Sequence, residues 1–135
     1  MSYSSIITTL QTKIGAIAGV QACLTAEPKQ FTVYPTVTIM PLGHTQNYKS
    51  FRDTEYHYSF VIRIYGQLDG TFTTSQIKVR DIADLIMDAL NKDPRLGGTI
   101  DFSELDDGSF SFQQREAPNY VFEMKYKVSV LVPRY

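Results

Sequence analysis

Two long stretches of strict alternation constrain this chain more than any other feature. From Thr54 to Ile64, an apolar or aromatic side chain occupies every second position: Tyr56, Tyr58, Phe60, Ile62 and Ile64. From Tyr120 to Val132, the same period places Tyr120, Phe122, Met124, Tyr126, Val128, Val130 and Val132. Successive side chains of a strand point to opposite faces, so alternation of this length predicts two long β-strands.

Two other segments repeat at the helical period. Ser4 to Ile17 predicts an amphipathic helix with Ser4 or Ser5 as its N-cap, and its apolar stripe is Ile6, Ile7, Leu10, Ile14 and Ile17. Thr73 to Leu90 predicts a second helix, whose stripe is Ile82, Leu85, Ile86, Ala89 and Leu90. Its start can be capped by Thr73, Thr74 or Ser75, and Asp93-Pro94 stops the chain soon after Asn91.

Shorter elements fill the remainder of the chain. Val20 to Leu24 is consistent with a short strand. Thr36 to Leu42 is β-branched and apolar, but Pro41 cannot donate to a ladder, so this strand should be short or lie at an edge. Gly43 to Ser50 is polar and predicts a connecting loop.

A hairpin is predicted before the last strand. Ile100 to Leu105 and Phe110 to Gln114 flank Asp107-Gly108, a dipeptide that favours tight hairpin turns. Gly97-Gly98 lies between a helix end and a strand and should turn the chain. The expected fold is α+β, a mainly antiparallel sheet with two helices packed on one face. At 135 residues, the chain should form one domain over 1–135.

Composition argues against several classes of protein. Lys and Arg number 13 against 14 Asp and Glu, so a general nucleic-acid binder with a basic stripe is not expected. No apolar run approaches the ~20 residues that span a bilayer, and the first residues do not form a signal peptide. The single Cys23 cannot form an internal disulfide and should be a small buried hydrophobe. We expect a soluble protein made in a reducing cytoplasm, with no membrane partner.

No arrangement of residues indicates catalysis. His44 and His57 are the only histidines and lie 13 positions apart, with no Cys or His cluster nearby, so neither a metal site nor a cofactor is expected. The acidic group Glu104, Asp106 and Asp107 is explained by the preference of turns for Asp. Phosphate-binding and nucleophile-elbow motifs are absent from the sequence. The chain is therefore not expected to be an enzyme.

The long strands suggest contacts with other molecules. A strand of about 13 residues spans roughly 43 Å, whereas a compact body of this size is roughly 37 Å across. The strands should therefore overshoot the body or bend around it, unless bulges or loops shorten them. Their second face is mixed, which is typical of an interface but also of a solvated sheet face. The candidate subunit-interface residues are Val61, Arg63, Tyr65, Glu123 and Lys125.

Taken in order, these segments resemble the tail terminator proteins of long-tailed bacteriophages, a family with related tail-completion and head–tail joining proteins. The resemblance covers nearly the whole chain. It consists of the opening amphipathic helix, YPTVTIMPLG (Tyr34 to Gly43), TEYHYSFVIRIYGQ (Thr54 to Gln67), QIKVRDIADLIMDAL (Gln76 to Leu90), the hairpin, and NYVFEMKYKVSVLV (Asn119 to Val132). The motifs are loose hydrophobic patterns, and only their order carries the resemblance.

The resemblance implies a structural protein of the virion, assembled in the host cytoplasm. A homohexameric ring would cap the tail tube, stop its elongation and offer a surface to the head–tail connector or stopper protein. Within this picture, the candidate partner-binding residues are Tyr48, Phe51 and Arg52 of the polar loop and Asp107 of the hairpin tip.

Two alternatives stay open. One is another neck or minor tail component, such as a head-closure or tube protein. The other is a small ferredoxin-like ligand-binding or enzymatic domain, which a pocket formed by His57, Arg63 and Glu123 would favour.

Overall fold

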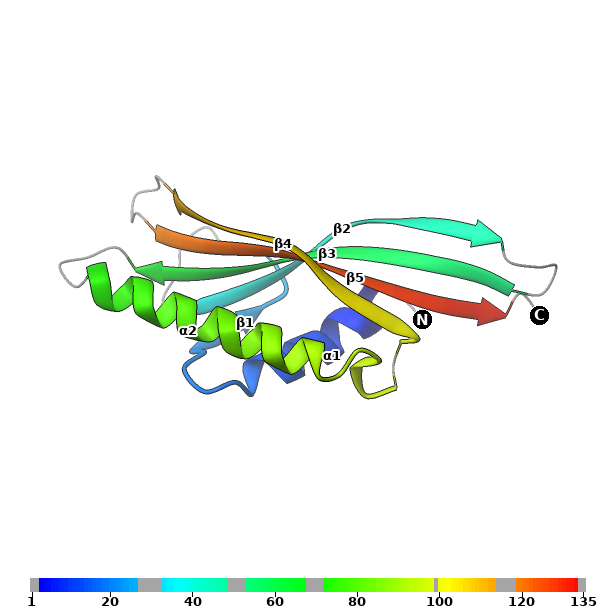
Figure 1. The fold of residues 1–135 in the computed structure, drawn as a ribbon, viewed down its shortest axis with the longest axis horizontal. Coiled ribbons are helices and arrows are strands. Elements are labelled where there is room, and N and C mark those ends of the chain that lie inside the picture. The colour runs from blue at the N-terminus through cyan, green and yellow to red at the C-terminus, as the bar shows by residue number, and fades with distance from the viewer. Residues whose placement is uncertain are drawn as a thin grey trace.

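The computed structural model describes residues 3–26, 33–48, 53–67, 72–98, 100–113 and 119–133. Within them, five strands form one sheet in the order β1-β2-β3-β5-β4, and two α-helices and a 3₁₀ turn complete the fold (Figure 1). The elements are α1 (Tyr3–Gly15), β1 (Ala22–Leu24), β2 (Thr36–Tyr48), β3 (Asp53–Gln67), α2 (Phe72–Asn91), η1 (Leu96–Gly98), β4 (Phe102–Gln113) and β5 (Asn119–Pro133).

The two alternating stretches form the centre of the sheet. β3 and β5 pair antiparallel without a register shift, from Asp53 opposite Pro133 to Gln67 opposite Asn119. β2 and β4 flank them, also antiparallel, and only the three-residue β1 runs parallel, beside the start of β2. The mainly antiparallel sheet predicted from the alternation is confirmed.

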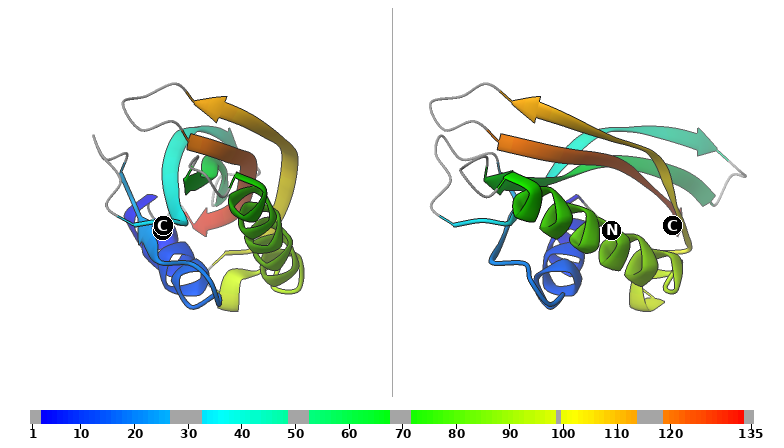
Figure 2. Two further views of the ribbon diagram at one scale, coloured as in Figure 1. Left: turned by 90° about the vertical axis from the view of Figure 1, so that its left-hand side faces the viewer. Right: turned by 60° about the vertical axis from the view of Figure 1, so that its left-hand side comes forward.

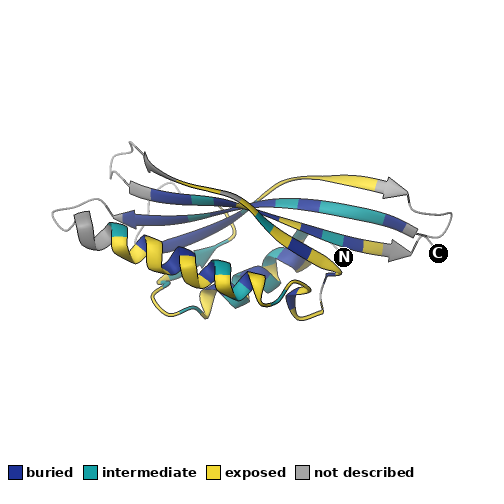
Figure 3. Ribbon diagram, in the orientation of Figure 1, coloured by how far each residue is buried: buried dark blue, intermediate teal, exposed yellow. Residues whose placement is uncertain are grey.

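Both helices cover the same face of this sheet, as the two views of Figure 2 show. We call this the inner face and the opposite one the outer face. Ile6, Leu10 and Ile14 of α1 are fully buried, as the stripe of the first helix predicts. α2 alternates buried and exposed positions along its length (Figure 3), and its buried residues are Val79, Ile82, Ala83, Ile86 and Leu90. The α+β fold with two helices on one face is confirmed.

The ends of three strands reach beyond both helices (Figure 1). We call this projecting part the arm; it comprises Thr45–Tyr48 of β2, Asp53–His57 of β3 and Ser129–Pro133 of β5. β3 and β5 are each 15 residues long, which corresponds to roughly 50 Å of strand. Shortening by a bulge does not apply to the β3–β5 pair, which is uninterrupted, and the ends of both strands overshoot the helices (Figure 1).

The predicted hairpin at Asp107-Gly108 is wrong. β4 runs continuously from Phe102 to Gln113, with a bulge between Leu105 and Gly108, and the chain reverses only between Gln113 and Asn119. Gly108 is required for another reason: a Cβ there would lie 2.7 Å from the Cζ atom of Phe122. A local turn signal has thus been overridden by pairing with β5, and the glycine accommodates an aromatic ring.

The predicted loop from Gly43 to Ser50 is also wrong over the part that is described. β2 continues to Tyr48, with an irregularity between Pro41 and Gly43, because these polar residues pair with the first half of β3. The edge position predicted for this strand is correct beyond Thr38, where β1 ends. Pro41 lies in this unpaired-edge part of β2, directly before the irregularity in its pairing with β3.

The helix boundaries differ from prediction by a few residues. α1 begins at Tyr3, so Ser4 and Ser5 lie in its first turn rather than at an N-cap, and it ends at Gly15. α2 begins at Phe72, which places the predicted cap residues Thr73 to Ser75 inside the helix. Such shifts at helix ends are common, since propensity specifies an end only within a turn.

Candidate interaction surfaces

The structure brings all five predicted interface residues together on the outer face. Arg63 lies opposite Glu123, Val61 opposite Lys125, and Tyr65 opposite Val121. Their neighbours along each strand point to the helices and form the core, which places these five residues on the other side of the sheet. The shared face was predictable from the alternation alone.

Their exposure divides the five residues into two kinds. Val61 is 2% exposed and Tyr65 is fully buried, so neither offers surface to a partner. Both lie outside the core cluster beneath the helices, which means that the outer face buries apolar groups of its own. Arg63 and Glu123 are partly exposed and Lys125 is exposed. An interface on this face would therefore contact the charged residues and not the apolar pair.

The charged residues are largely paired within the chain. Arg63 Nε donates to Glu123 Oε2 at 3.1 Å, across strands β3 and β5. On the neighbouring edge, Lys127 Nζ lies 3.0 Å from Asp106 Oδ2, in the bulge of β4. Because these side chains are partly exposed, each pair contributes less than about 1 kcal/mol to stability. Lys125 forms no ion pair with any described residue and remains available as a cation.

Three side chains at the base of the arm form a hydrogen-bonded relay that the sequence did not reveal. His57 Nε2 is 2.6 Å from Glu55 Oε1, and His57 Nδ1 is 3.1 Å from Ser129 Oγ. A carboxylate only accepts, so Nε2 carries a proton, and in the neutral ring Nδ1 accepts from the serine. Ser129 was missed because it lies some 70 positions from His57 in sequence and meets it only through the β3–β5 register.

The relay has the residue types of a nucleophilic triad but a different setting. Ser129 lies within a strand paired on both sides, opposite His57 and Phe102. A strand in this position uses its backbone N–H groups in the ladder, whereas acyl transfer needs free donors that converge on an oxyanion. The described geometry therefore supports hydrogen bonding across the sheet, and it provides no oxyanion site at Ser129.

An open hollow of about 390 Å³ lies next to the relay on the outer face; its described lining residues are Glu55, Asp101, Phe102, Ser129 and Leu131. Phe102 and Leu131 are 56% and 47% exposed, and together they line the hollow with apolar surface. The Asp101 carboxylate accepts a hydrogen bond from the backbone N–H of Leu131 at 2.6 Å. Asp101 thus takes the place of a ladder partner for Leu131, just before β4 begins. The described lining includes neither Arg63 nor Glu123.

A second hollow, of about 360 Å³, lies between α1 and the turn after α2. Lys13 Nζ meets Asp93 Oδ2 at 3.0 Å, and the backbone N–H of Gly97 donates to Asp93 Oδ1 at 2.9 Å. These two donors, the Gly97 amide first, lower the pKa of Asp93. Gly97 and Gly98 have φ of 66° and 89°, so the predicted turn is confirmed. The Asp93 carboxylate thus binds both Lys13 and the Gly97 amide, and connects α1 to the turn after α2.

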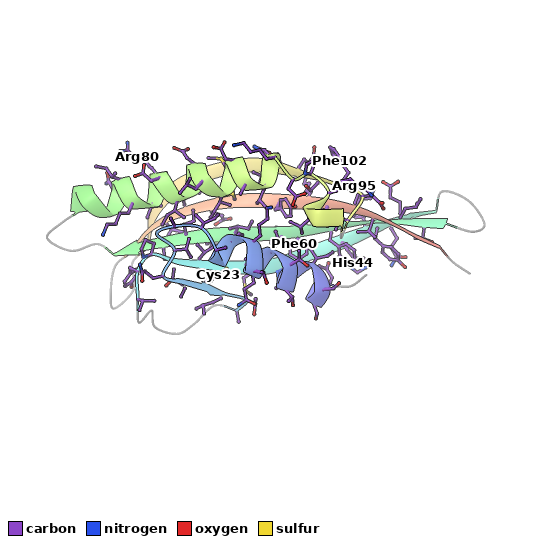
Figure 4. All side chains as sticks on the ribbon, turned by 90° about the horizontal axis from the view of Figure 1, so that it is seen from below. Cys23, His44, Phe60, Arg80, Arg95 and Phe102 are labelled. Atoms are coloured by element: carbon purple, nitrogen blue, oxygen red, sulfur yellow. The ribbon has the colours of Figure 1, made fainter. Side chains whose placement is uncertain are left out.

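An aromatic cluster joins α1 to the arm on the inner face. Tyr3 packs edge-on against Tyr58 and Phe60, with ring centroids 4.7 and 5.7 Å apart, and its hydroxyl lies 3.1 Å from His44 Nδ1. Tyr56 stacks on Tyr58 at 6.0 Å. His44 was predicted as a surface loop residue; it is exposed, but it lies in β2, where Figure 4 shows it on the sheet near the end of α1.

The predicted partner-binding residues are placed only in part. Tyr48 is the last residue of β2, and Phe51 and Arg52 fall between the paired ends of β2 and β3, outside the described residues. The prediction that Asp107 marks a hairpin tip is wrong, because this residue sits in the bulge of an edge strand. The side chains of Tyr48 and Asp107 also lie outside the described part of the chain.

Other chemistry is limited in the part of the chain that the structure describes. No group of three or more His, Cys, Asp or Glu residues there could hold a metal ion. Cys23 is partly buried, and burial raises its pKa to about 11, so its thiol stays protonated at neutral pH. None of the described helices is long and apolar enough to cross a membrane. Comparison of the sequence with protein-family models and with curated proteins gives no match.

Proposed function

We propose that this protein is a structural component of a bacteriophage neck, a tail terminator that assembles as a ring on the end of the tail tube. The observation that carries the proposal is the arm: three long strands that continue past a helical layer covering one face only (Figure 1). A sheet with one covered face and a projecting end has more interaction surface than a monomer of this size needs.

The proposed mechanism is steric and adhesive. A ring on the growing end of the tube occupies the positions where further tube subunits would add, and its opposite side offers a surface to the head–tail connector or stopper protein. Each subunit of a ring needs two different complementary patches, because contacts in a rotational ring are heterologous. The exposed residues of the outer face, such as Lys125, and the arm offer such surfaces, whereas Val61 and Tyr65 are already buried within the subunit.

A hexamer is the ring size that the resemblance implies, with assembly in the host cytoplasm and a final location in the virion tail. A head-closure or tube component is the alternative within the same class. The relay of Ser129, His57 and Glu55 is the one described feature that favours a ligand-binding or enzymatic domain. Its position in a fully paired strand makes that the weaker candidate.

The test is the mass of the purified protein across a concentration series, with and without cognate tail tubes. A ring in solution, or a monomer recruited to tube ends that then stop growing, is the expected result. A monomer that ignores tubes at every concentration would exclude the proposal.

A further inference from the structure

Two exposed patches of the chain are complementary in charge and in apolar character. The first, the acidic hollow, comprises Phe102 and Leu131 with the carboxylates of Glu55, Asp101 and Glu104. Glu104 is exposed and lies two residues beyond Phe102 on the same face of β4. The nearest cation by register is Lys127, opposite Glu104, but its ammonium group is 3.0 Å from Asp106. The hollow is therefore apolar at its centre and negative at its rim.

The second patch, the basic turn, lies on the solvent side of α2 and comprises Ile77, Lys78 and Arg80. Ile77 is 41% exposed, and both cations are exposed and form no ion pair with any described residue. Asp81 follows one turn after Ile77, and beyond it the helix surface is acidic.

The two patches cannot meet within one subunit. Arg80 and Phe102 lie far apart along the long axis of the molecule in Figure 4. The basic turn is in the first half of α2, while the hollow is beside the arm, at the other end of the sheet (Figure 1). Any contact between them must therefore join two molecules.

We infer that the basic turn of one copy docks into the acidic hollow of the next. Ile77 covers Phe102 and Leu131, and Lys78 and Arg80 meet the carboxylates of Asp101 and Glu104. The inference rests on the proposed function, because it names the two patches by which copies of the chain would join. A contact of this kind is head-to-tail, since each copy keeps one free hollow and one free turn.

The charges favour contact between a hollow and a turn over contact between two hollows or two turns. Two hollows facing each other would bring together the carboxylates of Asp101 and Glu104, and two basic turns would bring together four cations. Like charges across an interface are costly and suppress the wrong partner. Edge-to-edge strand pairing is also disfavoured, because β2 carries Pro41 on its open edge and β4 carries a bulge.

Two variants test the inference by complementation. The hollow variant is Phe102→Ser with Glu104→Lys, and the turn variant is Ile77→Ser with Arg80→Glu. All four side chains are exposed, so the fold should be retained, as circular dichroism and thermal unfolding would check. Asp101 is left unchanged because its carboxylate caps the backbone of Leu131. Each variant alone should self-associate at least roughly tenfold more weakly than the wild type in analytical ultracentrifugation.

The mixture of the two variants provides the sharper result. The hollow variant keeps an intact turn and the turn variant keeps an intact hollow, so together they should associate mainly as one-to-one dimers, because the two altered patches that remain free have lost the apolar contact of Phe102 with Ile77. A single chain that carries Glu104→Lys and Arg80→Glu, with the charges exchanged, should regain self-association. Leu85→Ser on the same helix and Leu42→Ser in β2 are matched controls, with side chains 45% and 55% exposed. Both controls should associate like the wild type.

The outcomes separate this inference from the proposed function. If the wild type associates but both variants keep its mass, or if the mixture gives no dimer, the pairing of these patches is wrong and the copies associate through another surface. If the wild type remains monomeric at every concentration, free copies of the chain do not join through the basic turn and the acidic hollow, and the inference is wrong. A separate measurement, of whether the wild-type protein stops the growth of tail tubes, then tests the proposed function.

Discussion

The two faces of the central β3–β5 pair share one backbone and one register but are built in different ways. The inner face contains only apolar and aromatic side chains where the helices cover it, among them Phe60, Ile62 and Met124. The outer face alternates buried apolar residues with a half-exposed ion pair and a hydrogen-bonded relay. The comparison indicates that the inner face supplies most of the stability, while the outer face retains the charged and hydrogen-bonding groups that could meet a partner.

The largest expected loss of stability follows from a substitution on the inner face. Ile62→Ala removes a fully buried side chain beneath the helices and should lower the free energy of unfolding by about 2–5 kcal/mol. Lys125→Ala, on the adjacent strand but exposed on the outer face, should change it by less than about 0.5 kcal/mol. Urea unfolding of both variants measures the difference. Similar losses for the two would contradict the assignment of stability to the inner face.

A smaller loss of stability is expected when Val61 is truncated. This substitution tests whether the chain itself buries Val61 on the outer face. Val61→Ala should cost about 2 kcal/mol, because the side chain is only 2% exposed in the single chain. Unfolding should be followed at a concentration where the protein is monomeric. A loss that appears only when the protein is assembled would mean that a neighbouring subunit, and not the chain itself, buries this valine.

A gain in stability is expected when Tyr126, on the inner face, is replaced by phenylalanine. Its hydroxyl is fully buried and has no hydrogen-bond partner of good geometry among the described residues. Ser103 lies close enough to lower the pKa slightly, but the Ser103 hydroxyl itself donates to the Pro94 carbonyl at 2.9 Å. Tyr126→Phe should therefore raise the free energy of unfolding by about 1 kcal/mol. A loss of similar size would show that the hydroxyl is satisfied in solution.

The same residue should make stability fall at high pH. Burial raises the pKa of Tyr126 above its ordinary value of 10.0, so the folded state holds its proton where the unfolded state releases it. The unfolded chain then binds fewer protons, and stability decreases as pH rises above about 10. Unfolding midpoints measured across this range should decline less steeply in Tyr126→Phe. Cys23, whose pKa is raised to about 11, contributes in the same direction and is unchanged in both proteins.

The smallest effect belongs to the outer-face ion pair. A double-mutant cycle with Arg63→Gln and Glu123→Gln should give a coupling free energy of less than about 1 kcal/mol, because both side chains are partly exposed. The coupling should weaken further as salt is added. A coupling of several kcal/mol would show that the pair is shielded from water, which an oligomer could cause, so the cycle should be repeated at low protein concentration.

The failures of sequence interpretation share one physical cause. Asp107-Gly108 has the composition of a tight turn, and Gly43 to Ser50 has that of a loop, yet both contribute to strands because a long neighbour offers hydrogen-bonding partners. Local preferences are worth about 1 kcal/mol or less per residue, which pairing along an extended strand can exceed. The relay at His57 and the hollow at Phe102 were missed for the same reason, since their members are distant in sequence.

The sequence by itself determined the two helices, the two central strands and the assignment of Arg63, Glu123 and Lys125 to one face, because periodicity is a local property of the chain. Only the tertiary structure decided that Val61 and Tyr65 are buried on that face, that Gly108 makes room for Phe122, and that Phe102 and Leu131 remain exposed. Periodicity divides residues between faces, whereas burial depends on which distant segments come to lie against each face, and that information appears only once the chain has packed.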